Sequence, residues 1–224
     1  MLLLATVAAA SPWLGNLEAY TSFPTDVGLR GTLEGPGRVR VTGSVGLLPR
    51  PYLGVINDTA TAQGWYDDDT ADLVDAALQD ALVLRAHLGW RPFPTLGFQF
   101  ELGYGWIGLG GGLTSAQILE AEYGYDFDWL LGDDYDFAAA ATLHRVEASV
   151  GWEHVIGTHL LVRWDLGASY TLDATARVER EFDGWPFDAA LDDLQDDAEN
   201  DLERVLERHV HTPIVALGVG WRFQ

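Results

Sequence analysis

The sequence of 224 residues contains no cysteine and no lysine. Without cysteine there is neither a disulfide framework nor a thiolate that could bind a metal or act as a nucleophile. The 13 cationic residues, all arginine, face 34 acidic ones, and the formal net charge is −21. A surface this acidic repels phosphate backbones, so nucleic acid is excluded as a partner. Uncharged apolar runs of about 18 residues are also missing, which argues against a transmembrane helix.

The chain is rich in apolar side chains, at 48% hydrophobic and 12% aromatic residues, and this excludes a disordered chain. Its length favours a single domain, which we place at residues 11–224. The first ten residues, MLLLATVAAA, form an apolar run that ends in small residues. This run is either the remnant of a secretory signal peptide, without its basic start, or an N-terminal strand.

Alternation of large apolar and small or polar residues dominates the rest of the chain. In the last segment, Val215, Leu217 and Val219 alternate with Ala216 and Gly218. A period of two predicts β-strands. The pattern predicts seven of them, at residues 27–34, 38–48, 81–91, 96–108, 142–154, 160–172 and 214–224. A weaker segment at residues 13–23 is taken as the eighth, because a barrel of antiparallel strands from one chain has an even strand count.

The connections between these strands alternate in length. Breaks at 35–37, 92–95 and 155–158 are short, whereas 49–80, 109–141 and 173–212 are long. Each long connection contains a predicted helix: one starting near Thr70 after Asp69 as N-cap, one from Thr114 to Gly124, and one from about Pro186 to His209. We therefore expect an all-β, closed antiparallel barrel of about eight strands, with short helices in long loops at one end.

The two faces of the predicted strands indicate a membrane barrel. The apolar faces are large and aromatic, whereas the polar faces combine glycine and serine with isolated charges, as expected for a narrow lumen. Aromatic residues near strand ends resemble the interfacial girdles of membrane barrels. We assign six residues to such a girdle: Trp90, Trp106, Trp152, Trp164, Trp221 and Phe223.

Over residues 13–224 the chain resembles the small outer-membrane barrels of Gram-negative bacteria, of the OmpA and OmpW types. Its ending, residues 219–224 (VGWRFQ), resembles the assembly signal of that class, although Gln224 follows the aromatic residue on which the class usually ends. The resemblance implies export, insertion by the outer-membrane assembly machinery, and location in the outer membrane next to lipid and lipopolysaccharide. It implies no activity.

Charged residues on the polar faces are predicted to lie in the lumen. The predicted network consists of Arg85, Glu101, Arg145, Glu147, Arg163, Asp165 and Arg222, with Arg30 and Arg40 as further candidates. Buried charges of opposite sign stabilise a barrel only when they are paired, so this set predicts a packed, sealed lumen and a structural or surface-interaction role. The alternative is a narrow polar channel.

Two further functions remain open at the level of sequence. His87 shares the lumen face with carboxylates and serines, which allows an enzyme acting on lipid or envelope substrates, but no motif places a nucleophile beside it. No catalytic residue is therefore assigned, and we expect no enzyme. A soluble ligand-binding barrel is the other alternative.

Acidic residues gather in the long connections, for example at 67–75, 126–136 and 188–203. Such clusters usually form a solvated surface, although their oxygen donors make them candidates for divalent cations. Asp126 and Asp128 lack the remaining positions of an EF-hand loop, and the glycines from Gly108 to Gly112 lack a phosphate-binding pattern. We therefore predict neither a specific metal site nor a cofactor.

Overall fold

A computed structural model describes residues 13–62, 81–93, 95–114, 136–180 and 212–223 of the chain. Eight strands form a closed barrel in which each strand pairs antiparallel with the next and the last pairs with the first. The strands are β1 (Leu14–Phe23), β2 (Asp26–Glu34), β3 (Val39–Leu47), β4 (Leu82–Phe93), β5 (Phe98–Thr114), β6 (Asp136–Ile156), β7 (Leu160–Arg180) and β8 (Thr212–Phe223). The predicted fold class is thereby confirmed.

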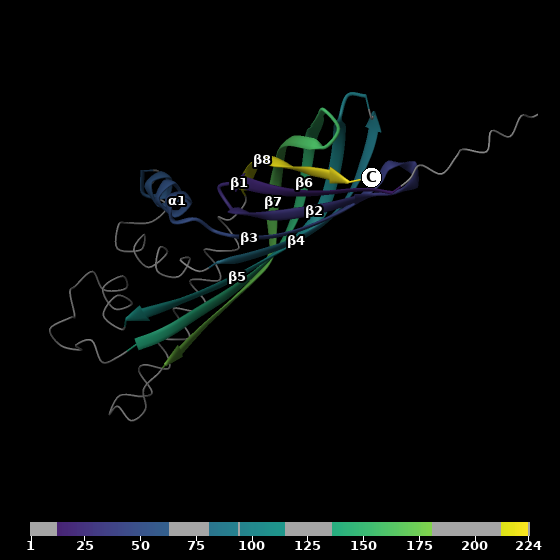
Figure 1. Ribbon diagram of the computed structural model, residues 1–224. Coiled ribbons are helices and arrows are strands. Elements are labelled where there is room, and N and C mark those ends of the chain that lie inside the picture. The colour runs from purple at the N-terminus through teal and green to yellow at the C-terminus, as the bar shows by residue number, and fades with distance from the viewer. Residues whose placement is uncertain (1–12, 63–80, 94, 115–135, 181–211, 224) are drawn as a thin grey trace, which may run out of the picture.

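The two ends of the barrel differ in their connections. The turns after β2, β4 and β6 are short, and the first of them contains the 3₁₀ turn η1 (Pro36–Arg38). We call this the short-turn end; the C-terminal end of β8 lies there (Figure 1). The long connections after β3, β5 and β7 belong to the opposite end, which we call the loop end.

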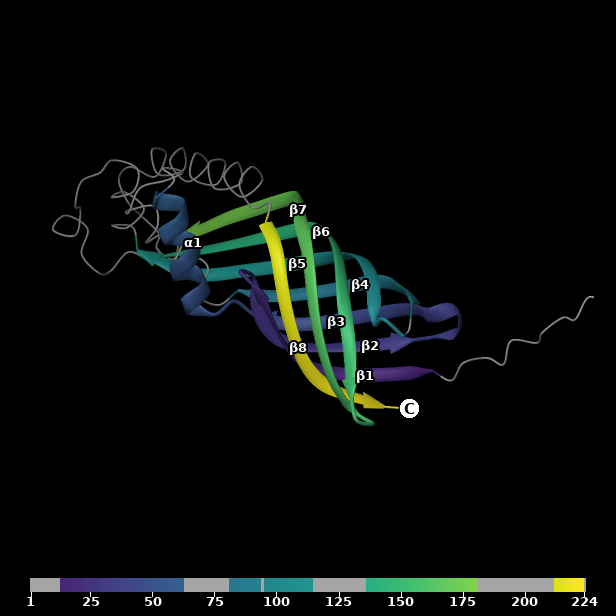
Figure 2. The same cartoon turned by 90° about the horizontal axis from the view of Figure 1, so that it is seen from above.

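Three strands extend well beyond the others at the loop end. β5 has 17 residues, and β6 and β7 have 21 each, against 9 to 12 in the other strands. Figures 1 and 2 show their ends projecting past the rest of the barrel on the side where the helix α1 (Arg50–Ala62) lies.

The predicted boundaries of two long connections, 109–141 and 173–212, are therefore wrong. β5 continues to Thr114, where a helix was expected to begin, and β6 and β7 pair with each other as far as Phe137 and Arg180. The glycines 110–112 pair with the alanines 138–140 in a regular ladder. Runs of identical small residues carry no alternation, so periodicity could not identify them as strands.

The first long connection contains a helix that the sequence analysis missed. α1 occupies residues 50–62, upstream of the predicted start near Thr70. Pro51 lies in its first turn, where proline is tolerated because that N–H has no helical partner. The helix is held to the barrel by its side chains: the Tyr52 hydroxyl bonds to the Thr21 hydroxyl, and its ring contacts the Phe23 ring edge-on at 5.2 Å. Gly54 and several β-branched residues weaken helix propensity here, which explains the miss.

The other predicted helices, near Thr70, between Thr114 and Gly124, and from Pro186 to His209, lie outside the described residues apart from Thr114 itself, as do residues 1–10. Within the described part of the chain, no helix has the length and apolar character needed to cross a membrane.

Burial is reversed relative to a water-soluble barrel. Among the described residues, 21 buried residues are polar or charged and 12 are hydrophobic, whereas 30 large hydrophobic side chains are exposed. Leu102 is 65% exposed, Leu88 62% and Leu217 57%, and all three point outward from strand centres. Arg40, Arg145 and Arg163 are at most 1% exposed. The barrel thus has an apolar outer surface and a charged interior.

Candidate functional site: the charged lumen

The lumen contains equal numbers of opposite charges. Seven arginines and seven carboxylates point inward from the eight strands, all buried apart from Arg222, whose side chain is 15% exposed. They are Arg30, Arg40, Arg85, Arg91, Arg145, Arg163 and Arg222 with Glu18, Asp26, Glu34, Glu101, Glu147, Glu153 and Asp165. The interior is therefore formally neutral, and it divides into three groups along the barrel axis.

The lower group lies at the short-turn end and is centred on Glu153. Its carboxylate accepts hydrogen bonds from Arg40 Nη2 at 2.7 Å, from Arg91 Nη1 at 3.2 Å and from Arg222. Arg91 also pairs with Glu34 at 2.7 Å. Three cations on one carboxylate close this end of the barrel with charge-assisted hydrogen bonds, the strongest kind available to a buried side chain.

The middle group is centred on Arg163, which is fully buried. Its Nη2 donates to Glu101 Oε2 at 2.6 Å, and its Nε donates to Asp165 at 2.9 Å. Arg30 bridges two strands in the same group, with Nε at 2.9 Å from Glu18 Oε1 and Nη1 at 2.9 Å from Asp165 Oδ2. Each of these two arginines thus contacts more than one carboxylate.

Gln99 joins the lower and middle groups. Its side-chain oxygen accepts a hydrogen bond from Arg40, and its Nε2 donates to Asp165 Oδ1 at 3.1 Å. The lower group has one positive charge in excess and the middle group one negative charge in excess. Because the amide of Gln99 both accepts and donates, it connects these two groups without adding charge itself.

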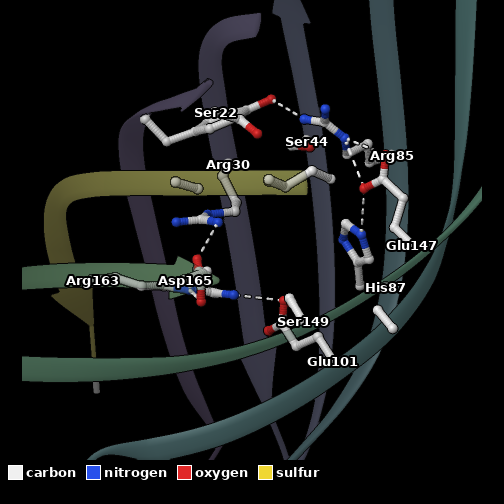
Figure 3. Close-up of a pocket in the computed structure, with 14 residues that line it drawn as sticks. Ser22, Arg30, Ser44, Arg85, His87, Glu101, Glu147, Ser149, Arg163 and Asp165 are labelled. Carbon is white, nitrogen blue, oxygen red and sulfur yellow. Dashed lines mark hydrogen bonds and ion pairs between the residues drawn. The ribbon is translucent and has the colours of Figure 1, made fainter. Parts of the chain in front are cut away.

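The upper group surrounds Arg85. Its Nη1 lies 2.6 Å from Asp26 Oδ1 and its Nε lies 3.0 Å from Glu147 Oε2. His87 Nε2 lies 3.1 Å from the same Glu147 oxygen, and the Tyr20 hydroxyl donates to Asp26. Figure 3 shows Arg85 and His87 converging on Glu147 from β4.

Arg145 differs from the other lumen arginines. It is 1% exposed, yet its Nε and Nη2 have no hydrogen-bond partner, and within the described ranges no carboxylate oxygen lies within 4 Å. Toward the loop end the next inward positions of β6 are apolar. They belong to a buried apolar cluster on the loop-end side of the charges: Ala81, Val83, Ile107, Leu109, Ala141, Leu143 and Ala174, with Leu48 packed against it.

Glycines make the room that the lumen carboxylates occupy. A Cβ atom added at any of five inward glycines would lie within 3.0 Å of an acidic side chain. The pairs are Gly46 with Asp26, Gly89 with Glu101, Gly105 with Glu147, Gly151 with Asp165, and Gly218 with Glu18. The interior is consequently packed against its charges, and the glycines of the polar strand faces have a steric function.

Replacing Gly151 with alanine is expected to destabilise the barrel by about 1 to 3 kcal/mol, as overpacking does. The new Cβ would lie 2.0 Å from Asp165 Oδ1 and 2.9 Å from the Trp164 carbonyl oxygen. The matched control is Gly43→Ala, where the nearest atom is 4.0 Å away on the outer face. There alanine should be neutral or stabilise by about 0.5 to 1 kcal/mol. Urea unfolding of both variants measures the difference; equal effects would contradict a packed lumen.

The structure places all seven residues of the sequence-predicted network inside the barrel. Arg163 contacts Glu101 and Asp165, and Arg85 contacts Glu147, whereas Arg222 pairs outside this set and Arg145 lacks an ion pair among the described residues. Arg30 and Arg40 are also inside. Sequence reasoning left out Glu18, Asp26, Glu34, Arg91 and Glu153, although their parity within each strand would have identified them.

Aromatic residues gather on the outer surface toward the short-turn end. Trp152 and Trp164 stack in parallel at 4.2 Å on β6 and β7, and Trp221 stacks on His159 at 4.9 Å. Of the six assigned girdle residues, the ones on this end are Trp90, Trp152, Trp164, Trp221 and Phe223, whereas Trp106 lies nearer the loop end. Amphipathic aromatic rings near one end of a barrel are typical of a lipid–water boundary.

No group of three or more His, Asp or Glu residues suited to a metal ion occurs in the part of the chain that the structure describes. The seven lumen carboxylates are engaged by arginine. Their chemistry is structural ion pairing, with no exposed donor set for a cation.

Comparisons with known proteins find similarity in the fold only. No protein-family model matches the chain, and no curated protein matches it. Among solved structures, a major outer membrane protein from Thermus thermophilus is 14% identical with a TM-score of 0.49, covering 96% of this chain and 100% of that one. The N-terminal β-barrel domain of Pseudomonas aeruginosa OprF is 9% identical with a TM-score of 0.42, covering 96% and 99%. Acinetobacter baumannii CarO is 11% identical with a TM-score of 0.41, covering 93% and 97%.

The outer surface of the barrel indicates which kind of β-barrel this is. Within the barrel wall each strand pairs with both of its neighbours, and the outward positions from strand to strand are apolar. An apolar outer surface on a closed barrel suits lipid, because a sheet that spans hydrocarbon must close so that its backbone groups are paired. The chain has the architecture of an eight-stranded outer-membrane β-barrel with a charged lumen.

Proposed function

We propose that the protein is a structural or surface-interaction barrel of the bacterial outer membrane whose lumen is sealed. One observation carries this proposal: six of the seven lumen arginines pair with the seven lumen carboxylates, and a cavity of about 40 Å³ lies between the middle and upper groups. One water molecule needs about 10 to 15 Å³ of cavity volume. A cavity of this size suits a few waters.

The charge outside the lumen supports an outward orientation of the loop end. Since the lumen holds seven charges of each sign, 27 acidic residues and six arginines remain elsewhere, and these account for the whole net charge of −21. All 27 fall within residues 58–80, 120–136 and 173–207, in the connections of the loop end and the strand ends that border them. In membrane barrels the longer loops lie outside the cell.

This distribution bears on the proposed partners. Insertion requires the outer-membrane assembly machinery, and the bilayer covers the apolar surface. Anionic lipopolysaccharide would be repelled by the acidic loop end, so its approach requires divalent cations that bridge carboxylate and phosphate oxygens. We include these cations in the proposal as shared ligands of the protein and the lipid, without a dedicated protein site.

The surroundings of His87 favour a role without catalysis. Its Nε2 bonds to Glu147, and its Nδ1 has no hydrogen-bond partner, so no serine hydroxyl of the described chain lies within reach of either ring nitrogen. Nucleophilic catalysis needs such a contact near the substrate. The imidazole lies instead in the lumen, below the apolar cluster.

Planar-bilayer recording tests the sealed lumen. We expect no steady ion current through the reconstituted wild-type protein, because the ion pairs fill the interior cross-section. Circular dichroism and the gel shift between heated and unheated samples, taken on the same preparation, control for insertion of folded protein. Steady currents on the nanosiemens scale would show an open path, and the alternative interpretation as a channel would replace the proposal.

A further inference from the structure

A small cavity lies inside the barrel between the middle and upper charge groups (Figure 3). Its volume is about 40 Å³. The middle group contributes Arg30, Glu101, Arg163 and Asp165 to its lining, and the upper group contributes Tyr20, Arg85, His87 and Glu147. Three serines complete the polar part of the wall: Ser22, Ser44 and Ser149.

The lumen network is interrupted at this cavity. Hydrogen bonds join the lower group to the middle group through Gln99. Among the described residues, none joins the middle group to the upper one; the direct contact across the gap is the Arg30 guanidinium over the Tyr20 ring, 5.1 Å from its centroid. The three Arg30 nitrogens donate to Glu18 and Asp165 within the middle group, so this contact adds no hydrogen bond between the two groups.

Several polar groups at the cavity lack partners. Arg163 is 1% exposed, and its Nη1 makes no hydrogen bond, because the nearest carboxylate oxygen, Glu18 Oε1, is 3.8 Å away. His87 Nδ1, on the same wall, is also without a partner. A buried polar group without a partner is costly, and ordered water is the usual remedy in a polar cavity.

The charges of the wall select water over an ion. Three guanidinium groups, of Arg30, Arg85 and Arg163, face three carboxylates in the lining. The sum is zero, so neither a cation nor an anion gains net attraction. We propose that the cavity binds about three water molecules, the number that its volume holds at 10 to 15 Å³ each, and that these waters bridge the middle and upper groups of the network.

Filling the cavity tests this site. Ser149→Val removes the hydroxyl and puts an extra methyl group into the space. In the detergent-solubilised protein, oxygen-17 relaxation dispersion should then count about two or three fewer long-lived internal waters than in the wild type. The thermal midpoint should fall. The matched control is Ala168→Val on the outward face of β7, which should leave the water count unchanged.

Two results would overturn the assignment. An unchanged water count with a raised midpoint would mean that the methyl group fills a dry cavity. A rise in wild-type stability with added halide that Ser149→Val abolishes would indicate an anion. If Ser149→Val does not fold, Ser149→Ala keeps the space, and the count should stay at or above that of the wild type; a lower count contradicts the site. A dry cavity in a non-conducting barrel would remove this inference and leave the proposed function intact.

Discussion

Replacing Arg163 with alanine should lower the free energy of unfolding by about 3 to 5 kcal/mol, the cost of breaking a buried ion pair by removing one partner. Arg163 is the main cation of the middle group, with Glu101 at 2.6 Å and Asp165 at 2.9 Å. Without it, Glu101 keeps a hydrogen bond from Thr42 but loses its ion pair, and Asp165 keeps Arg30. The loss therefore falls mainly on Glu101, which is 5% exposed.

The control is Arg38→Ala at the short-turn end. Arg38 is exposed, and its described hydrogen bond runs from Nη1 to the Pro92 carbonyl oxygen at 2.9 Å. An exposed substitution of this kind changes stability by about 0.5 kcal/mol or less. Urea unfolding in detergent measures both variants. A double variant, Arg163→Ala with Glu101→Gln, should recover part of the loss because the uncompensated charge is removed. Similar small effects of both single variants would contradict a buried ion pair between Arg163 and Glu101.

The barrel was predictable from the sequence because its strands obey a strict period of two. Register and face follow from that period, since shifting a strand by one residue would move every apolar side chain into the lumen. The alternation is clearest in β8, where Val215, Leu217 and Val219 point outward and are all about half exposed.

Parts of the structure without alternation could not be predicted in the same way. The extension of β5 through Gly110–Gly112 depends on its partner, the alanines of β6, and such pairing is a property of two distant segments. A bulge between His144 and Arg145 shifts the inward parity of β7, so that Thr171 and Ala174 both point inside. Tertiary pairing determines these features, and a local pattern does not report it.

The detailed pairing inside the lumen was also beyond the sequence. The alternation places Arg222 and Glu153 on inward faces, but which carboxylate each arginine contacts depends on the stagger of strands around the barrel. The structure joins Arg222 of β8 to Glu153 of β6 across the interior. The sequence therefore identified most of the charged residues in the lumen, whereas the closure of the barrel determines which of them contact one another.

The central claim is that the apolar faces of the strands point outward into lipid. A charged residue placed on this face at mid-strand tests the claim. Leu102 is 65% exposed, points outward from β5, and pairs with Leu88 and Ala148 of the flanking strands at the middle of the barrel wall. An arginine on the lipid-facing side at the bilayer midplane costs about 2 to 4 kcal/mol, whereas near the interface it costs about 0 to 1 kcal/mol. Leu172, 56% exposed on β7 toward the loop end, provides the matched interfacial position.

The measurement is the unfolding free energy of Leu102→Arg and Leu172→Arg in phospholipid vesicles, each compared with the wild type. A barrel whose apolar surface is embedded in lipid predicts a loss of about 2 to 4 kcal/mol for Leu102→Arg and a loss of about 1 kcal/mol or less for Leu172→Arg. A surface in contact with water would tolerate arginine at both positions. Equal stability of Leu102→Arg and the wild type, with the protein soluble in the absence of detergent, would contradict the membrane barrel.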